Sequence, residues 1–163
     1  MMTYEMALQR LTALCASAEH CEYEMMEKMR KWEVEETDRE RIMEYLRQAK
    51  FVDDERYARA FVKDKVRYNK WGRRKVEQGL WAKHIPEDIR QRVLDEVDDS
   101  EYMSVLIDLL KAKRRGIKAD TDYEVNIKLV KYAMSRGFDY HIIRRCIDCD
   151  GSFDCDEMPE PDC

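Results

Sequence analysis

Apolar residues recur with the spacing of an α-helix along almost the whole chain, and this pattern restricts the folds available to it. Nine segments carry such a stripe, from Ala7, Leu8 and Leu11 near the start to Ile142 and Cys146 near the end. No segment alternates with the period of two that a half-buried strand requires. The chain has 163 residues but only five glycines and three prolines, which suit short connections rather than many tight turns. The sequence therefore predicts an all-α protein.

Local signals indicate where several of these helices begin. Two pairs have the spacing of a capping box: Thr37 with Glu40, and Thr121 with Glu124. In such a box each side chain accepts a hydrogen bond from a free backbone N–H at the helix start. Pro86 followed by two acids is typical of a first helical turn.

The helices also repeat in groups of three, with a period of about 45 to 50 residues. Segments 80–94 and 133–147 align, so that three apolar positions correspond: Ile85, Ile89 and Val93 with Phe138, Ile142 and Cys146. The first group ends in the same way, with a longer connection after Trp32. We expect three tandem three-helix, helix-turn-helix-like repeats at 1–52, 53–97 and 98–148 that form an elongated, curved body. A coincidence of amphipathic helices is the alternative.

The ends of the chain bear on its location. The N-terminal residues lack the apolar core of a signal peptide, and no apolar run approaches the roughly 20 residues that cross a bilayer. We expect a cytoplasmic monomer without membrane contact, whose six cysteines are reduced thiols. Residues 149–163 form an acidic tail, whose composition predicts disorder.

Positive charge is concentrated in residues 55–75, which carry nine bases and two acids in a chain of formal net charge -5. Arg56, Arg59, Lys63, Arg67 and Lys70 are three or four residues apart, which places them on one face of a helix with no acid on that line. An ordinary solvated face is the alternative to a binding surface.

Three further bases, Arg73, Arg74 and Lys75, open the next helix. Cations there oppose the helix dipole by about 0.3 to 1 kcal/mol each, whereas a bound anion would be held by them and by the free N–H groups. We therefore predict that these eight bases contact an anionic partner, either nucleic-acid phosphate or an acidic protein surface. The neighbouring Tyr68 and Trp71 either stack on bases or close a small core.

No catalytic constellation is visible. The three histidines are scattered, and no nucleophile elbow, phosphate-binding glycine loop or zinc-protease motif occurs, so we expect no enzyme activity and no cofactor. Cys146 and Cys149 form a C-x-x-C, and Cys155 and Cys163 follow, but a second closely spaced pair is lacking. Cys146 also lies on the apolar period of the last helix, which favours a buried thiol over a metal ligand.

Residues 46–94 resemble the central part of the RecX regulatory proteins. The resemblance rests on an acidic pair before an aromatic-Ala helix, a basic segment, and a glycine opening a helix that ends in leucine: Asp53, Asp54, Tyr57, Ala58, Gly72 and Leu80. Residues 136–147 resemble the family's closing Arg-Gly-Phe and helix. The chain departs from the family at His84, where glycine is frequent, at Cys21, where serine is usual, and in its tail.

The resemblance implies three tandem three-helix repeats and no enzymatic activity. It also implies binding in the groove of the filament that RecA recombinase forms on single-stranded DNA, typically restraining ATP hydrolysis, strand exchange and the SOS response. Direct contact with single-stranded DNA stays open. A stand-alone helical DNA-binding module and an α-solenoid-type protein scaffold are the rival hypotheses.

Overall fold

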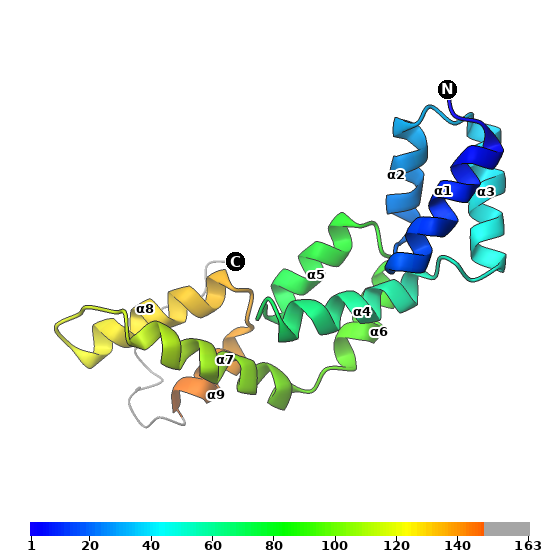
Figure 1. The fold of residues 1–163 in the computed structure, drawn as a ribbon. Helices are drawn as coiled ribbons and strands as arrows, with labels where there is room; N and C mark the ends of the chain where they lie inside the picture. The colour runs from blue at the N-terminus through cyan, green and yellow to red at the C-terminus, as the bar shows by residue number, and fades with distance from the viewer. Residues whose placement is uncertain (149–163) are drawn as a thin grey trace. The chain divides into compact units, whose positions relative to one another are not determined.

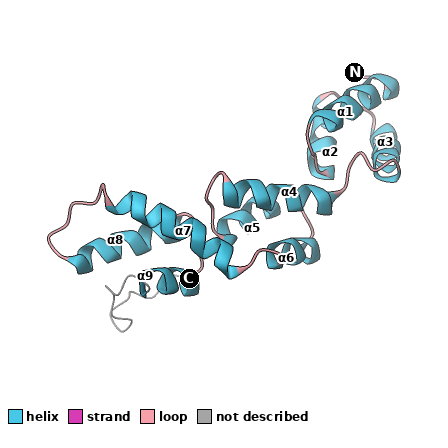
Figure 2. Ribbon diagram, turned by 60° about the horizontal axis from the view of Figure 1, so that its bottom comes forward, coloured by secondary structure: helices cyan, strands magenta, loops and turns pink. Residues whose placement is uncertain are grey.

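The computed structural model of the chain describes residues 1–148, and these residues form helices joined by short connections (Figures 1 and 2). The helices are α1 (Tyr4–Ser17), α2 (Glu22–Lys31), α3 (Glu36–Gln48), α4 (Asp54–Arg67), α5 (Arg73–Ala82), α6 (Glu87–Asp95), α7 (Asp99–Arg114), α8 (Asp122–Ser135) and α9 (Tyr140–Asp148). No strand occurs within residues 1–148, which confirms the predicted all-α class. None of their helices has the length and apolar character needed to cross a membrane. The tail at 149–163 lies outside the described residues.

A four-residue connection of one design recurs three times, between α2 and α3, α5 and α6, and α8 and α9. Its second residue is left-handed, with φ of 56° at Glu33, 57° at His84 and 88° at Gly137. The third residue is buried, and its N–H donates to the carbonyl five residues earlier: Val34 to Met29, Ile85 to Leu80 and Phe138 to Ala133. This geometry closes the preceding helix and turns the chain into the next one.

The buried positions on the helices repeat in the same register. The second helix of each group buries two residues four apart, and the third buries two adjacent residues: Met25 and Met29, Val76 and Leu80, Leu129 and Ala133; then Ile42 and Met43, Val93 and Leu94, Cys146 and Ile147. These matches confirm the three-helix repeat. The repeat boundaries after residues 52 and 97 stay a prediction.

The structure corrects three expectations. The connection after Trp32 is no longer than the others, and the buried residues Val34, Ile85 and Phe138 are 51 and 53 positions apart rather than about 45 to 50. Thr37 is not a cap, because α3 already begins at Glu36. The start of α3 is set by the burial of Val34, whereas the spacing of Thr37 and Glu40 matches a capping box by chance.

Other predicted helix starts are confirmed. The Thr121 hydroxyl accepts a hydrogen bond from the Glu124 N–H at 3.2 Å. The Glu124 carboxylate accepts from the Asp120 N–H instead of closing the box on Thr121. The helix α6 begins at Glu87, directly after Pro86.

The chain divides into two compact units. Unit 1 contains residues 1–61 and 79–93, and unit 2 contains residues 62–78 and those from 94 onward. In unit 1, α1 and α2 pack on α3 around a core that includes Leu11, Met25 and Ile42 (Figure 1). In unit 2, α7, α8 and α9 pack on one another around residues such as Leu106, Leu129 and Ile143.

Candidate anion-binding surface

The eight predicted contact residues are divided between the two units. Arg56 and Arg59 belong to unit 1. The Arg56 guanidinium lies 2.8 Å from the Glu19 carboxylate and donates to the carbonyls of Lys50 and Phe51 at 3.0 and 3.3 Å. Arg59 forms an ion pair with Glu55. Arg56 therefore fastens the α3–α4 connection, a structural role that the spacing of the bases does not reveal.

The remaining six bases lie in unit 2, two of them on α4. Lys63 and Arg67 are exposed, and Arg67 reaches Glu101 of α7 at 3.4 Å. An ion pair between exposed groups contributes about 0 to 1 kcal/mol, so a phosphate or a partner carboxylate can replace Glu101 at little cost. Lys63 has no ion-pair partner among the described residues.

Lys70 does not continue the helical stripe, because α4 ends at Arg67. It takes a left-handed conformation with φ of 57° in the α4–α5 connection, and the next residue, Trp71, donates its N–H to the Lys65 carbonyl at 3.0 Å. The Lys65 and Lys75 ammonium groups each lie 4.8 Å from the centre of the Trp71 ring. Trp71 thus packs between the end of α4 and the start of α5, held by the two ammonium groups on its ring.

The start of α5 differs from the prediction in an important respect. Its N–H groups are not all free: Arg74 donates to the Gly137 carbonyl and Gly72 to the Arg136 carbonyl, both at 2.9 Å. Because those carbonyls follow directly after α8, the positive end of one helix dipole faces the negative end of another. An anion therefore cannot use the Arg74 N–H, which leaves fewer backbone donors at this helix start than the sequence predicts.

Close backbone approach makes this corner of unit 2 possible. A Cβ atom on Gly72 would lie 2.3 Å from the Phe138 nitrogen, and one on Gly137 would lie 2.3 Å from the Lys75 Cβ. The Arg136 guanidinium also donates to the Asn69 carbonyl, which ties the α4–α5 connection to the end of α8. The basic side chains are thus displayed on a fixed backbone.

The three cations at the start of α5 have different environments. Arg73 is partly buried and lies 2.7 Å from the Asp95 carboxylate, whereas Arg74 is exposed and has no ion-pair partner among residues 1–148. Four of the six predicted contact bases in unit 2 form what we call the cationic surface: Lys63, Arg67, Lys70 and Arg74. These side chains can hold anions by charge and hydrogen bonding.

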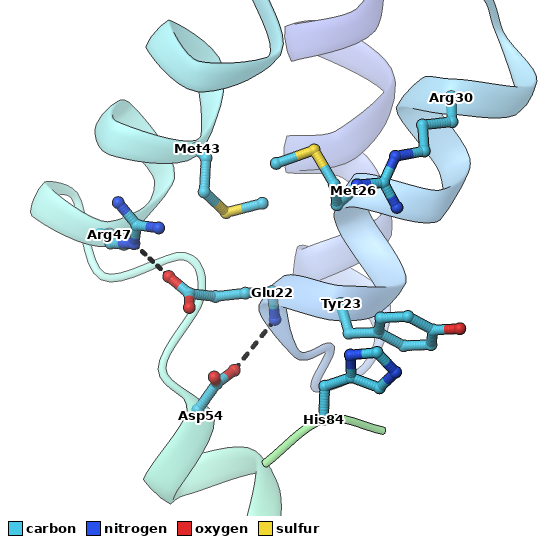
Figure 3. A pocket seen from close by; sticks show the side chains of 8 residues that line it. All are labelled: Glu22, Tyr23, Met26, Arg30, Met43, Arg47, Asp54 and His84. Atoms are coloured by element: carbon cyan, nitrogen blue, oxygen red, sulfur yellow. Dashed lines mark hydrogen bonds and ion pairs between the residues drawn. The ribbon is translucent and has the colours of Figure 1, made fainter. Parts of the chain in front are cut away.

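A groove of about 300 Å³ lies in unit 1 and was not predicted (Figure 3). The rings of Tyr23 and His84 stack on one side with centroids 4.0 Å apart. The Glu22 carboxylate pairs with Arg47, and the Glu22 N–H donates to Asp54 at 2.9 Å. Burial raises the pKa of Asp54, the bond from the Glu22 N–H opposes that shift, and the nearby Glu22 charge adds to it. Both acids therefore have structural roles: Asp54 accepts a hydrogen bond from the start of α2, and Glu22 pairs with Arg47.

The prediction that Cys146 is a buried thiol is confirmed, since its side chain is buried and its thiol lies 3.7 Å from the Met103 carbonyl. Cys149, Cys155 and Cys163 lie outside the described residues. Among residues 1–148, no three His, Cys, Asp or Glu side chains are gathered in a way that would hold a metal ion.

Comparison with known proteins identifies a family over more than half of the chain. Residues 53–94 match the second three-helix domain of RecX, and residues 99–147 match the third. The Regulatory protein RecX of Clostridium perfringens is 30% identical over 130 residues, which cover 76% of this chain and 60% of the relative. That of Chlorobium phaeobacteroides is 30% identical over 135 residues, covering 83% of this chain and 87% of the relative. The chain thus spans less than two thirds of the clostridial protein's length.

Solved structures show the same fold. The crystal structure of RecX from Lactobacillus salivarius matches with a TM-score of 0.80 and 18% identity, covering 89% of this chain and 94% of the other. A second crystal structure of a regulatory protein RecX matches with a TM-score of 0.81 and 19% identity, covering 89% and 71%.

Proposed function

Because the chain belongs to the RecX family, we propose that it is a non-enzymatic regulator that binds the RecA filament on single-stranded DNA and restrains its ATP hydrolysis and strand exchange. The partner and the inhibition are the expectations that the family resemblance carries, and relatives named regulatory proteins support the regulatory class. The cationic surface of unit 2 is the observation in this chain that favours such a partner.

The chemistry of that surface suits a filament of protein and DNA. A RecA filament on DNA presents phosphates, and lysine and arginine side chains bind phosphate by charge, with arginine adding a paired hydrogen-bond geometry. Lys63 and Arg74 are exposed without an ion-pair partner in the described part of the chain, so they need not break an existing ion pair to bind. They are the strongest candidates for the contact.

The test is RecA's ATP hydrolysis on single-stranded DNA, measured with this protein at well below one molecule per RecA subunit. The native protein is expected to suppress hydrolysis, and the double variant Lys63→Glu, Arg74→Glu to lose most of that effect. A matched control, Lys111→Glu with Lys131→Glu, changes the net charge equally at exposed positions of α7 and α8.

Circular dichroism must first show that all three proteins are equally helical. If the native protein leaves hydrolysis unchanged at every ratio, RecA regulation is rejected and the DNA-binding module and scaffold hypotheses move forward. If the surface variant and the control suppress equally, regulation stands but the cationic surface is not the contact.

A further inference from the structure

Tyr68 is the most exposed aromatic side chain among the described residues, with 81% of its surface accessible. It follows directly after α4, between Arg67 and Asn69, and its ring makes no contact with another ring or cation in residues 1–148. Trp71, three residues later, is packed between Lys65 and Lys75. Of the two aromatic residues in residues 62–75, only Tyr68 presents its ring to solvent.

The backbone that carries Tyr68 is held on both sides. The N–H groups of Tyr68 and Asn69 donate to the Asp64 carbonyl, at 2.9 and 3.4 Å, and the Asn69 carbonyl accepts from the Arg136 guanidinium. Gly72 then closes the connection on the Arg136 carbonyl at 2.9 Å. A ring displayed on a fixed backbone loses little conformational freedom when a partner covers it.

The charge around Tyr68 is strongly positive. Lys63, Arg67 and Lys70 lie within five positions of it, and Arg67 keeps 61% of its side-chain surface accessible despite its ion pair with Glu101. Asp64 is the only acid in residues 62–75 and lies one helical turn before Tyr68. An exposed aromatic ring among cations is the combination that single-strand binding proteins use, with cations on the phosphates and the ring on a base.

We propose that Tyr68 stacks on an unpaired nucleobase and makes the cationic surface select single-stranded over double-stranded nucleic acid. Both forms present phosphates, but the bases of a duplex are already stacked and paired, so only a single strand offers a free base face to the ring. The inference deepens the proposed function, because the same surface would contact the DNA of the filament.

The experiment is fluorescence anisotropy with the full chain and no RecA, using a labelled oligo(dT) of about 20 nucleotides, an abasic strand of equal length and charge, and a duplex. We expect the oligo(dT) to bind most tightly. Tyr68→Ala should weaken oligo(dT) binding roughly 5- to 150-fold, the range for one lost base stack, while changing abasic binding little. Tyr68→Phe, which keeps the ring, should restore most of the affinity.

Tyr123→Ala serves as the control, because Tyr123 is also exposed but lies in the first turn of α8. Asp64→Asn should strengthen binding to the oligo(dT) and the abasic strand alike, since it removes a negative charge beside the phosphates. Equal affinity of the native chain for all three ligands, or an unchanged Tyr68→Ala titration, overturns the proposal.

The outcome is separable from that of the proposed function. If Tyr68→Ala binds oligo(dT) normally but no longer suppresses RecA's ATP hydrolysis, the ring contacts protein rather than a base, and regulation of the filament survives. If the DNA titrations follow the expectation while the native protein leaves hydrolysis unchanged, Tyr68 acts in DNA binding and the regulatory proposal fails.

Discussion

Single glycine residues permit the close backbone approach in the part of unit 2 that displays the cationic surface. Gly137 combines a left-handed φ of 88° with a position where a Cβ would lie 2.3 Å from that of Lys75. Gly137→Ala should therefore lower the free energy of unfolding by about 2 kcal/mol or more, through backbone strain and steric overlap. Gly116→Ala is the matched control, since its nearest contact would be an ordinary 3.7 Å, and should change stability by less than about 0.5 kcal/mol.

Urea unfolding followed by circular dichroism measures both variants. Equal midpoints for Gly137→Ala and Gly116→Ala would contradict the close approach of the α8–α9 connection to α5.

Burial disfavours the reactive thiolate form of Cys21, which lies at the start of α2. It precedes α2, its side chain is buried, and its thiol lies 3.6 Å from the Glu24 carboxylate. Burial raises the pKa of Cys21 to about 12, with the Glu24 charge adding to the shift. Since the thiolate is the reactive form, alkylation of Cys21 at about pH 8 should be at least about 100-fold slower in the native protein than in urea.

Peptide-resolved mass spectrometry of the alkylated protein gives this rate for Cys21 separately from the other cysteines. A native rate close to that in urea would show that the thiol is accessible and that the described cap is wrong.

The contact residues could be predicted from sequence only in part. Regular spacing identified Lys63 and Arg67 as neighbours on one face of α4, which the structure bears out. It could not identify Glu101 or Asp95 as partners of Arg67 and Arg73, because those acids are more than 20 positions away along the chain. Nor could it show that the Arg74 N–H of α5 donates to the Gly137 carbonyl just after α8, since that contact depends on packing within unit 2.

At the scale of the helices, left-handed residues that are not glycine close several of them. Glu33, Lys50, Lys70 and His84 all have φ between 56° and 61°. The family resemblance placed glycine at the position of His84, and the structure shows why, because a left-handed residue is required there. His84 adopts this strained left-handed conformation, and its ring stacks on that of Tyr23.

Replacement of Lys50 by glycine should stabilise the protein. Lys50 is exposed with φ of 61°, a conformation that costs an L-residue about 1 to 2 kcal/mol, whereas glycine adopts it without strain. After the entropy that glycine adds to the unfolded chain, we expect Lys50→Gly to raise the free energy of unfolding by about 0.5 to 1 kcal/mol.

Its neighbour provides the control. Ala49 is exposed with an ordinary φ of -81°, so Ala49→Gly should lower stability by about 0.5 to 1 kcal/mol. Thermal unfolding of the pair measures the difference in sign, and a shift in the same direction for both would contradict the left-handed cap.

The helices themselves were the most predictable part of the fold. The 3.6-residue period of apolar side chains identified every helical segment, because each helix buries one face. The exact start of α3 was not predictable from Thr37, since a residue of capping type can also occur in the first turn, as Thr37 does here. The burial of Val34 decides that start, and only alignment with Ile85 and Phe138 reveals it.

At the scale of the whole molecule, the net charge of the chain has the same sign as the phosphates of the proposed partner. The chain is acidic overall, with a formal net charge of -5, so its partner must be found by a local surface rather than by net attraction. Binding to the RecA filament should weaken steeply as salt rises if Lys63, Lys70 and Arg74 contact phosphate, because each contact releases counterions. A titration over a salt series measures the slope, and a flat profile would indicate a mainly apolar protein contact.

The most direct test of filament binding by the cationic surface is co-sedimentation of the protein with preformed RecA filaments on single-stranded DNA. We predict that the native chain and the Lys111→Glu, Lys131→Glu control sediment with the filaments, while the Lys63→Glu, Arg74→Glu variant stays largely in the supernatant. Equal sedimentation of all three would contradict the claim that the cationic surface of unit 2 makes the filament contact.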